Sequence, residues 1–152
     1  MALIEGKEIL LSVNLGTDAS PDWNIIGCST ADGFSLTVDS IAVSNKCSGG
    51  FTNGIPGDAS WSFSNNTSYP KTPDTGYTSY DDIFDLATTN RYDADGELRQ
   101  FKLENIVGAD FTYYRMGRGF ITDLGDQMDS GAVYTTDITI TGVKEVTNVQ
   151  ST

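Results

Sequence analysis

Carboxylates are the side chains of this sequence with the most scope for chemistry. Among 152 residues there are 21 Asp and Glu against 9 Lys and Arg, and there is no His. The chain on its own therefore cannot form a Ser-His-Asp site, a Cys-His site or a His-ligated zinc site. Paired carboxylates alone can hydrolyse glycosides, so the acidic clusters are the remaining candidates for catalysis.

Two acidic clusters have simpler explanations. The segment from Asp93 to Glu97 resembles the start of a calcium-binding loop, but the third acidic ligand and the distal Glu are missing at the required spacing. A solvated turn with Gly96 at a positive φ angle is the better interpretation. Asp81, Asp82 and Asp85 lie at the start of a predicted helix, where capping and the helix dipole explain them. We predict no catalytic residue, no cofactor site and no metal site, and we expect that the chain is not an enzyme.

The composition favours a single acidic β domain. The formal net charge of -12 makes the chain a poor non-specific binder of nucleic acid, although it suits a surface past which DNA moves without sticking. The charge is also explained by solubility alone. A hydrophobic content of 38% with 16 Gly indicates a sheet protein with many turns, and the length predicts one domain, 1–152.

The N-terminal sequence predicts a protein made in a cytoplasm, and this location in turn predicts the redox state of the two cysteines. The first 15 residues have no positively charged region before an apolar run, so they resemble neither a signal peptide nor a membrane span. We therefore expect Cys28 and Cys47 to be reduced thiols. The alternative is a disulfide closing a loop of about 20 residues.

Alternating residues predict most of the strands. The clearest strand runs from Val133 to Val143, followed by a polar C-terminal tail, 143–152, and a second runs over residues 7–15. The remaining predicted strands cover 23–29, 34–43, 60–64, 98–105 and 111–124. A hairpin is predicted at 31–33 and a loop over 65–77. Within the strands we predict a register slip at Asp39-Ser40 and an interruption at 117–119.

One helix is predicted, over residues 78–89. Tyr80, Ile83, Phe84 and Ala87 are spaced to form an apolar stripe that can cover a sheet, and Ser79 can cap the N-terminus. Between the strands near residues 43 and 60 lies a long loop, 46–58, with the turn-forming pairs Gly49-Gly50, Asn53-Gly54 and Pro56-Gly57. Because ordering so long a loop costs entropy, we expect it to contact another chain.

The order of these elements resembles the major tail tube proteins of long-tailed, siphovirus-type bacteriophages. The resemblance rests on three segments and extends over most of the chain. They are Ser44-Asn45-Lys46-Cys47-Ser48-Gly49-Gly50-Phe51 with Ile55-Pro56-Gly57, then Ala59-Ser60-Trp61-Ser62-Phe63-Ser64, and the first strand Gly6-Lys7-Glu8-Ile9-Leu10-Leu11-Ser12-Val13 with Trp23 after it.

The resemblance implies a fold and a role. The fold would be mainly β, sandwich- or barrel-like, with the helix packed on the sheets and long loops between strands. Copies would form hexameric rings stacked into the tail tube, through which DNA is ejected into the host. The implied partners are further copies of the chain, a tape-measure protein, tail terminator and distal tail proteins, and DNA as a cargo without specific binding. The implied location is the virion tail, after synthesis in the bacterial cytoplasm.

Under that resemblance, three groups of residues are expected to make the tube. The ring-bridging segments would be the N-terminal extension 1–6, the loop 46–58 and the tail 143–152, with Lys46, Ser48, Gly49, Gly50, Phe51, Asn53, Gly54, Ile55 and Pro56 as stacking candidates. The lumen candidates are the polar strand positions Thr135, Asp137, Thr139, Thr141, Glu8, Ser12 and Asn14. The basic candidates for docking a neighbouring subunit are Arg91, Arg99, Arg115 and Arg118, with Lys102 in the same window.

One alternative belongs to another class of protein. A monomeric β-sandwich module could bind carbohydrate through an aromatic platform of Trp23, Trp61 and the Tyr113-Tyr114 pair. These rings are equally explained as core and subunit-contact residues. Related alternatives are the tube of a different injection machine and a phage virion decoration protein.

Overall fold

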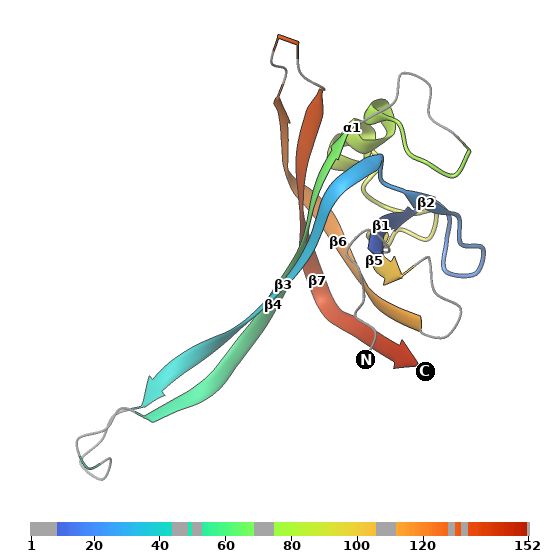
Figure 1. Cartoon of the computed structure of the whole chain (residues 1–152). Coiled ribbons are helices and arrows are strands. Elements are labelled where there is room, and N and C mark those ends of the chain that lie inside the picture. Colours follow the sequence, from blue (N-terminus) through green and yellow to red (C-terminus); the bar gives the residue numbers. More distant parts are fainter. Residues whose placement is uncertain are drawn as a thin grey trace.

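The computed structural model describes residues 9–43, 49, 53–68, 75–105, 112–127, 130–131 and 134–151. These residues form seven strands and one helix (Figure 1). In chain order the elements are β1 (Ile9–Asn14), β2 (Trp23–Ile25), β3 (Cys28–Val43), β4 (Asn53–Ser68), α1 (Tyr80–Thr88), β5 (Gln100–Asn105), β6 (Thr112–Gln127) and β7 (Thr135–Ser151). The predicted class, mainly β with one helix, is confirmed.

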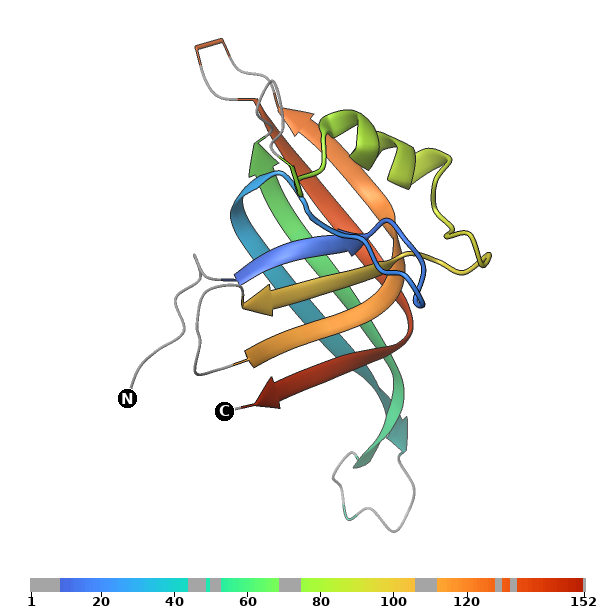
Figure 2. The same cartoon turned by 90° about the vertical axis from the view of Figure 1, so that its right-hand side faces the viewer.

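All seven strands belong to one antiparallel sheet. Its order is β2-β1-β5-β6-β7-β4-β3. The sheet forms two layers because β6 and β7 run through both of them and bend on the way (Figure 2). At the bend, Gly117 pairs with Val146 and Arg118 with Val143, so β7 carries two extra residues there. The predicted interruption near Gly117 is this bulge, and one sheet folded on itself supplies the sandwich-like architecture.

The core fills the space between the two layers. Its aromatic centre comes from β3 and β4, where the rings of Trp61 and Phe63 lie 5.2 Å apart and Phe34 lies 5.5 Å from Phe63. The predicted alternation of the last strand is confirmed, because Thr136, Ile138 and Ile140 are buried while the intervening residues are not. The remaining buried apolar side chains are Leu11, Val13, Ile26, Ile83, Leu86, Phe101, Leu103 and Ile121.

The helix begins where its sequence predicts a cap. The Ser79 hydroxyl accepts a hydrogen bond from the Asp82 amide at 3.2 Å, and the Asp82 carboxylate accepts one from the Ser79 amide at 3.1 Å. This reciprocal capping box satisfies two amides of the first turn. The predicted stripe is wrong in one respect: Phe84 is 49% exposed, and Ile83 and Leu86 are the buried residues of α1.

Two predicted irregularities of β3 have different outcomes. The slip predicted at Asp39-Ser40 is confirmed by a register shift between Val38 and Ser40. The hairpin predicted at 31–33 is wrong, because β3 continues through this segment with only a register shift between Ser29 and Ala31. A bulge accommodates the same small, polar residues without reversing the chain.

Three predicted loops are shorter than expected. Residues 53–58 of the predicted loop belong to β4, and β4 also continues to Ser68. Most of the predicted tail, 143–152, forms the second half of β7, where residues 146–151 pair with 112–117 of β6. The partners of 65–68 and of 146–151 lie in strands that are distant along the chain, whereas 53–56 pair with the preceding strand, β3. Local composition reveals neither kind of pairing. The N-terminal extension 1–6 lies outside the described residues.

The acidic segment at Asp93 is a turn, as predicted. The Asp93 carboxylate accepts hydrogen bonds from the amides of Asp95 at 2.9 Å and Glu97 at 3.0 Å, and Gly96 has a φ angle of 78°. Within the described ranges, no three or more Cys, Asp or Glu side chains gather as metal ligands. Nor does any helix in those ranges have the length and hydropathy that crossing a bilayer demands.

Candidate assembly surfaces

One face of the sheet consists almost entirely of short polar side chains. Residues that pair across antiparallel strands point to the same side, so the register fixes this surface, which we call the polar face. It comprises Ala31, Gly33, Ser35 and Thr37 of β3; Ser60, Ser62, Ser64, Asn66 and Ser68 of β4; Thr122, Asp123, Gly125 and Gln127 of β6; and Thr135, Asp137, Thr139 and Thr141 of β7.

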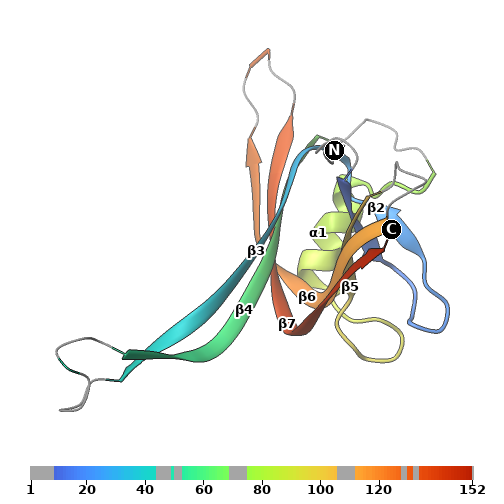
Figure 3. The same ribbon diagram turned by 60° about the horizontal axis from the view of Figure 1, so that its bottom comes forward.

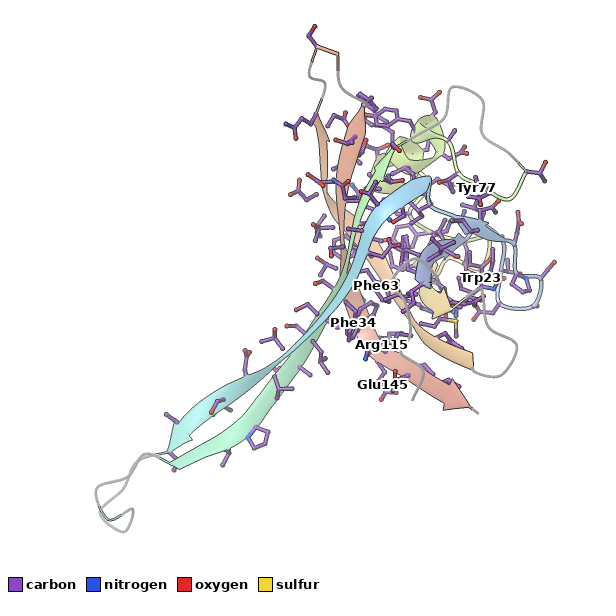
Figure 4. All side chains as sticks on the ribbon, in the orientation of Figure 1. Trp23, Phe34, Phe63, Tyr77, Arg115 and Glu145 are labelled. Carbon is purple, nitrogen blue, oxygen red and sulfur yellow. The ribbon has the colours of Figure 1, made fainter. Side chains whose placement is uncertain are left out.

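The polar face is neutral or acidic. Its charged groups are the carboxylates of Asp123 and Asp137, and none of its described residues is basic. Neighbouring strands share hydrogen bonds across it, as between the hydroxyls of Thr122 and Thr141 at 3.0 Å and between the Asn66 amide and Asp137. Half-buried Phe120, which pairs with Thr141, is the apolar exception at one end. Figure 4 shows short, oxygen-tipped side chains on this side of the sheet, opposite to α1.

The lumen candidates divide into two groups. Thr135, Asp137, Thr139 and Thr141 all lie on the polar face. Ser12 and Asn14 do not reach solvent, since they are 5% and 2% exposed, so the expectation that they line a channel is wrong. Asn14 is covered by the 15–22 loop, whose Gly16 and Asp22 amides both donate to its side-chain oxygen at 2.9 Å. Glu8 lies outside the described residues.

The four strands that carry the polar face have two unpaired edges. β3 pairs with β4 alone. β6 pairs with β5 only through Tyr114–Arg118, so beyond Gly119 no described strand pairs with its outer edge. Unpaired strand edges present backbone donors and acceptors to another chain. The two edges lie on opposite sides of the same four-stranded unit.

β3 and β4 extend beyond the rest of the molecule as a two-stranded arm. We define the arm as 36–43 of β3 and 53–60 of β4, which projects away from both layers (Figures 1 and 3). Five of the eight large apolar side chains that are exposed in the described residues lie on it, with exposures from 39% to 54%: Leu36, Val38, Ile41, Val43 and Ile55. An isolated two-stranded hairpin is marginally stable in water, and these apolar side chains have no cover within the described chain.

The stacking candidates lie at or beyond the end of this arm. Gly54, Ile55 and Pro56 are exposed positions of β4, and Asn53 begins the strand. Gly49 lies in a turn with a φ angle of 61°. Lys46, Ser48, Gly50 and Phe51 lie outside the described residues. Sequence reasoning missed Leu36 and Val38, whose alternation is indistinguishable from that of a core strand.

Two of the basic candidates are occupied within the chain. Arg99 is 8% exposed and donates to the carbonyl of Leu15 and the side chain of Asn90, both at 2.7 Å. Its predicted role in docking a neighbour is therefore wrong, because its guanidinium ties strands and loops of its own chain together. Arg118 is surrounded by the carboxylates of Asp18, Glu97 and Asp93, so the same prediction is wrong for it.

The other basic side chains lie apart from one another. The Lys102 ammonium pairs with Glu104 and lies 4.3 Å from the centre of the Trp23 ring. The Arg115 guanidinium lies 4.5 Å from the centre of the Phe34 ring, beside the base of the arm (Figure 4). Arg91 is exposed and donates to the Ala87 carbonyl at the end of α1. The five residues therefore do not form one basic face.

The proposed sugar-binding platform does not assemble. Trp61 is 6% exposed and packs in the core. Trp23 lies on β2, where Lys102 covers its ring. Tyr114 is half-buried in β6, and nothing is described of the Tyr113 side chain. The aromatic residues named for stacking on a sugar thus do not share an exposed surface.

Two carboxylates are held by specific contacts. Burial raises the pKa of Asp32 above its ordinary 3.8, although hydrogen bonds from Ser29 and Asn65 oppose this shift. Asp126 accepts a hydrogen bond from the Tyr80 hydroxyl at 2.7 Å and another from Thr136 at 3.1 Å, which fastens α1 to β6 and β7. The bond to Asp126 raises the pKa of Tyr80 above its ordinary range.

Solved structures with a similar fold come from gene transfer agent particles and from the SPP1 tail tube. A chain from the virion of a native gene transfer agent particle aligns over 97% of this chain and 99% of its own length, with a TM-score of 0.70 and 18% identity. A chain of the SPP1 tail tube aligns over 98% of this chain and 79% of its own, with a TM-score of 0.69 and 13% identity.

A third similar structure is the tail of an empty gene transfer agent particle, determined with C6 symmetry, with a TM-score of 0.69 and 18% identity over 97% and 99% of the two chains. Comparison with protein-family models gives no match, and comparison with curated protein sequences gives none either. The architecture belongs to the class of β-sandwiches in which one antiparallel sheet bends to form both layers. More narrowly, the chain has the tail tube fold, as its sequence resemblance predicts.

Proposed function

We propose that this protein is the subunit of a phage-type tail tube, the conduit through which DNA leaves the virion. Copies assemble into rings, and the rings stack into a tube. The observation that carries the proposal is the polar face, a broad sheet surface of short, neutral or acidic side chains on a chain of net charge -12. A channel with such a wall does not bind phosphate, because phosphate contacts depend on Lys and Arg.

The two unpaired edges support closure of a ring. The β3 edge of one copy would pair with the free edge of β6 of the next, so that each copy contributes β3, β4, β7 and β6 to one closed barrel. Closure would pair both edges of this four-stranded unit. The contact joins two different surfaces of the chain, which is the type of interface that generates rings. Six copies per ring follow the C6 symmetry of the similar gene transfer agent tail.

The arm supports contact between rings or between neighbours. Its exposed Leu36, Val38, Ile41 and Ile55 need cover, and a second copy of the chain provides it in the tube. Burying such side chains stabilises an interface by about 25 cal/mol per Å² of apolar surface removed from water. The stacking role of 46–58 and the lumen role of Thr135, Asp137, Thr139 and Thr141 belong to this proposal. Arg91 and Arg115 remain proposed contacts with a neighbour.

Further partners follow from the same role. A tape-measure protein would fill the tube before DNA enters, and terminator and distal tail proteins would close its ends. DNA would be a cargo without specific contacts. The protein would be a structural component of the virion tail without enzymatic activity.

Negative-stain electron microscopy of the purified protein at increasing concentration tests the proposal. The expected result is rings or hollow tubes that replace monomers as the concentration rises. The matched control is the double variant Ile41→Ser/Ile55→Ser, which should remain monomeric under the same conditions. Intact protein that stays monomeric at every concentration, including after addition of sheared tubes as seeds, would contradict the proposal.

A further inference from the structure

A groove follows the bend of β6 and β7 on the side away from the core. It has a volume of about 450 Å³ and is lined in part by Gln100, Met116, Val143, Lys144 and Thr147. A smaller hollow of about 210 Å³ shares Val143, Lys144 and Arg118 with it and is bounded by Tyr92. The groove thus combines the apolar side chains of Met116 and Val143 with polar and charged ones, among them Lys144, which lines both hollows.

Lys144 is unusual in both backbone and charge. Its φ angle of 64° is the one positive value at a non-glycine residue in the described ranges, and L-residues adopt this region at a cost. Among the described residues no carboxylate pairs with its exposed ammonium, although the chain has 21 acidic residues and Arg118 next to it binds three of them. Glu145 is a second charged residue of the lining, and it forms no described ion pair with Lys144.

The exposed face of α1 has the opposite character. Phe84, at 49% exposure, lies beside the exposed residues Asp81, three positions before it, and Asp85, which follows it. Asp81 and Asp85 are four residues apart, a spacing at which like charges destabilise a helix. Asp85 also lies beyond the first turn, where a carboxylate gains least from the helix dipole. Within the described chain no basic group pairs with Asp85.

Within one copy α1 lies above the bend of β6 and β7 (Figure 2), and no ion pair among the described residues joins Asp85 to Lys144. We infer that α1 of one copy docks in the bend groove of a neighbouring copy, with Phe84 in the groove and Asp85 paired with Lys144. This inference rests on the proposed self-assembly. The docking would give Lys144 a carboxylate partner, and it would place Met116 and Val143 against the exposed part of Phe84, whose ring lies 6.5 Å from that of Tyr80 in its own chain.

The contact joins two different surfaces that every copy carries. It can therefore repeat from copy to copy without limit, as a tube requires. Docking of Phe84 beside Met116 and Val143 would remove part of the surroundings of the ion pair from water, where an ion pair is stronger than on an open surface. Copies of net charge -12 repel one another. An attractive pair between Lys144 of one copy and Asp85 of the next therefore favours the one relative position of the two copies in which the charges meet.

Charge exchange tests the pairing. Lys144→Glu and Asp85→Lys are each expected to raise the concentration at which tubes form by at least about tenfold, and the double variant Lys144→Glu/Asp85→Lys to restore most of the loss. Asp22→Lys, at another exposed carboxylate, is the control for added positive charge. None of the three residues is buried, so each variant is expected to fold. The midpoint of unfolding in urea checks that each monomer is folded.

Separate outcomes distinguish this inference from the proposed function. If the intact protein forms tubes and both single variants form them at the same concentration, the docking of α1 in the bend groove is wrong while the tube assignment stands. If the single variants fail and the double variant also fails, the pairing of Asp85 with Lys144 is wrong. Intact protein that forms no tubes after seeding would overturn the assignment itself, and this inference with it.

Discussion

The indole Nε1 of Trp61 donates a hydrogen bond to the backbone carbonyl of Lys144 at 2.9 Å. This bond joins β4 to the bulge at which β7 leaves one layer and enters the other. The Trp61 ring lies directly over Gly117 and Gly142, where an added Cβ would come within 2.4 Å and 2.0 Å of it. The bend of the sheet is therefore stabilised by the buried Trp61 ring, which packs on Gly117 and Gly142, and by its hydrogen bond to Lys144.

Gly142→Ala is expected to destabilise the monomer, because the new methyl group would overlap the Trp61 ring. Overpacking of this kind costs about 1–3 kcal/mol, measured as the free energy of unfolding in urea. Gly125→Ala is the matched control: a Cβ there meets nothing within 4 Å, so its effect should stay within about 0.5 kcal/mol. Equal effects of the two substitutions would show that the ring does not hold the bend.

Ile41→Ser/Ile55→Ser should leave the monomer folded and prevent tube formation. The two residues pair across the arm and are 52% and 50% exposed, so the monomer gains little from burying them. The free energy of unfolding should change by about 0.5 kcal/mol or less, while sedimentation detects no polymer. The control is Tyr77→Ser, an exposed aromatic residue away from the arm. Polymers of normal length from the double variant would remove the arm from the assembly surfaces.

Asp137→Lys should slow the passage of DNA without preventing assembly. Asp137 is an exposed residue of the polar face, and a lysine there would attract phosphate in a wall that otherwise lacks positive charge. The measurement is the rate of DNA ejection from particles built with the variant, and the slowing should weaken as salt is raised. Asp95→Lys, in an exposed turn elsewhere, is the control. An unchanged ejection rate would place Asp137 outside the lumen.

Asp32→Asn should change how stability depends on pH. Burial raises the pKa of Asp32 in the folded chain above 3.8. The folded state therefore holds this proton more tightly than the unfolded state, and its stability falls as pH rises from 3.8 through the folded pKa. The difference in urea midpoint between the intact protein and Asp32→Asn, compared at about pH 4 and about pH 7, should shift in favour of the variant at the higher pH. A difference independent of pH would contradict the burial of this charge.

Local patterns in the sequence were sufficient for the strand faces and the helix cap. The alternation from Thr135 to Thr141 predicts the buried Thr136, Ile138 and Ile140, because a strand with one covered face alternates with period two. The parity change at Asp39 predicts the bulge there. Ser79 as a cap, with Asp81 and Asp82 in the first turn, predicts the helix start, because these interactions are local; the reciprocal bond from the Ser79 amide to Asp82 is added by the structure.

Features that depend on distant partners could not be predicted. The polar sequence after Gly142 forms a strand only because residues 112–117 lie beside it. Arg99 is buried because the carbonyl of Leu15, 84 residues earlier, accepts its hydrogen bond. Asn14 has the polarity of a lumen residue and the burial of a core residue, since the loop that follows it folds back over it. Sequence spacing carries no signal for such pairs.

The two open edges of the polar-face strands make every newly made copy competent to pair with another at once. The shared charge of -12 opposes such encounters, and its reach is limited to a Debye length of about 8 Å at physiological ionic strength. Edge pairing and self-repulsion therefore set a threshold concentration of subunits for nucleation, which is higher at low ionic strength and lower at high ionic strength. A pool of free subunits can persist below that threshold and be consumed rapidly once a template presents the first ring.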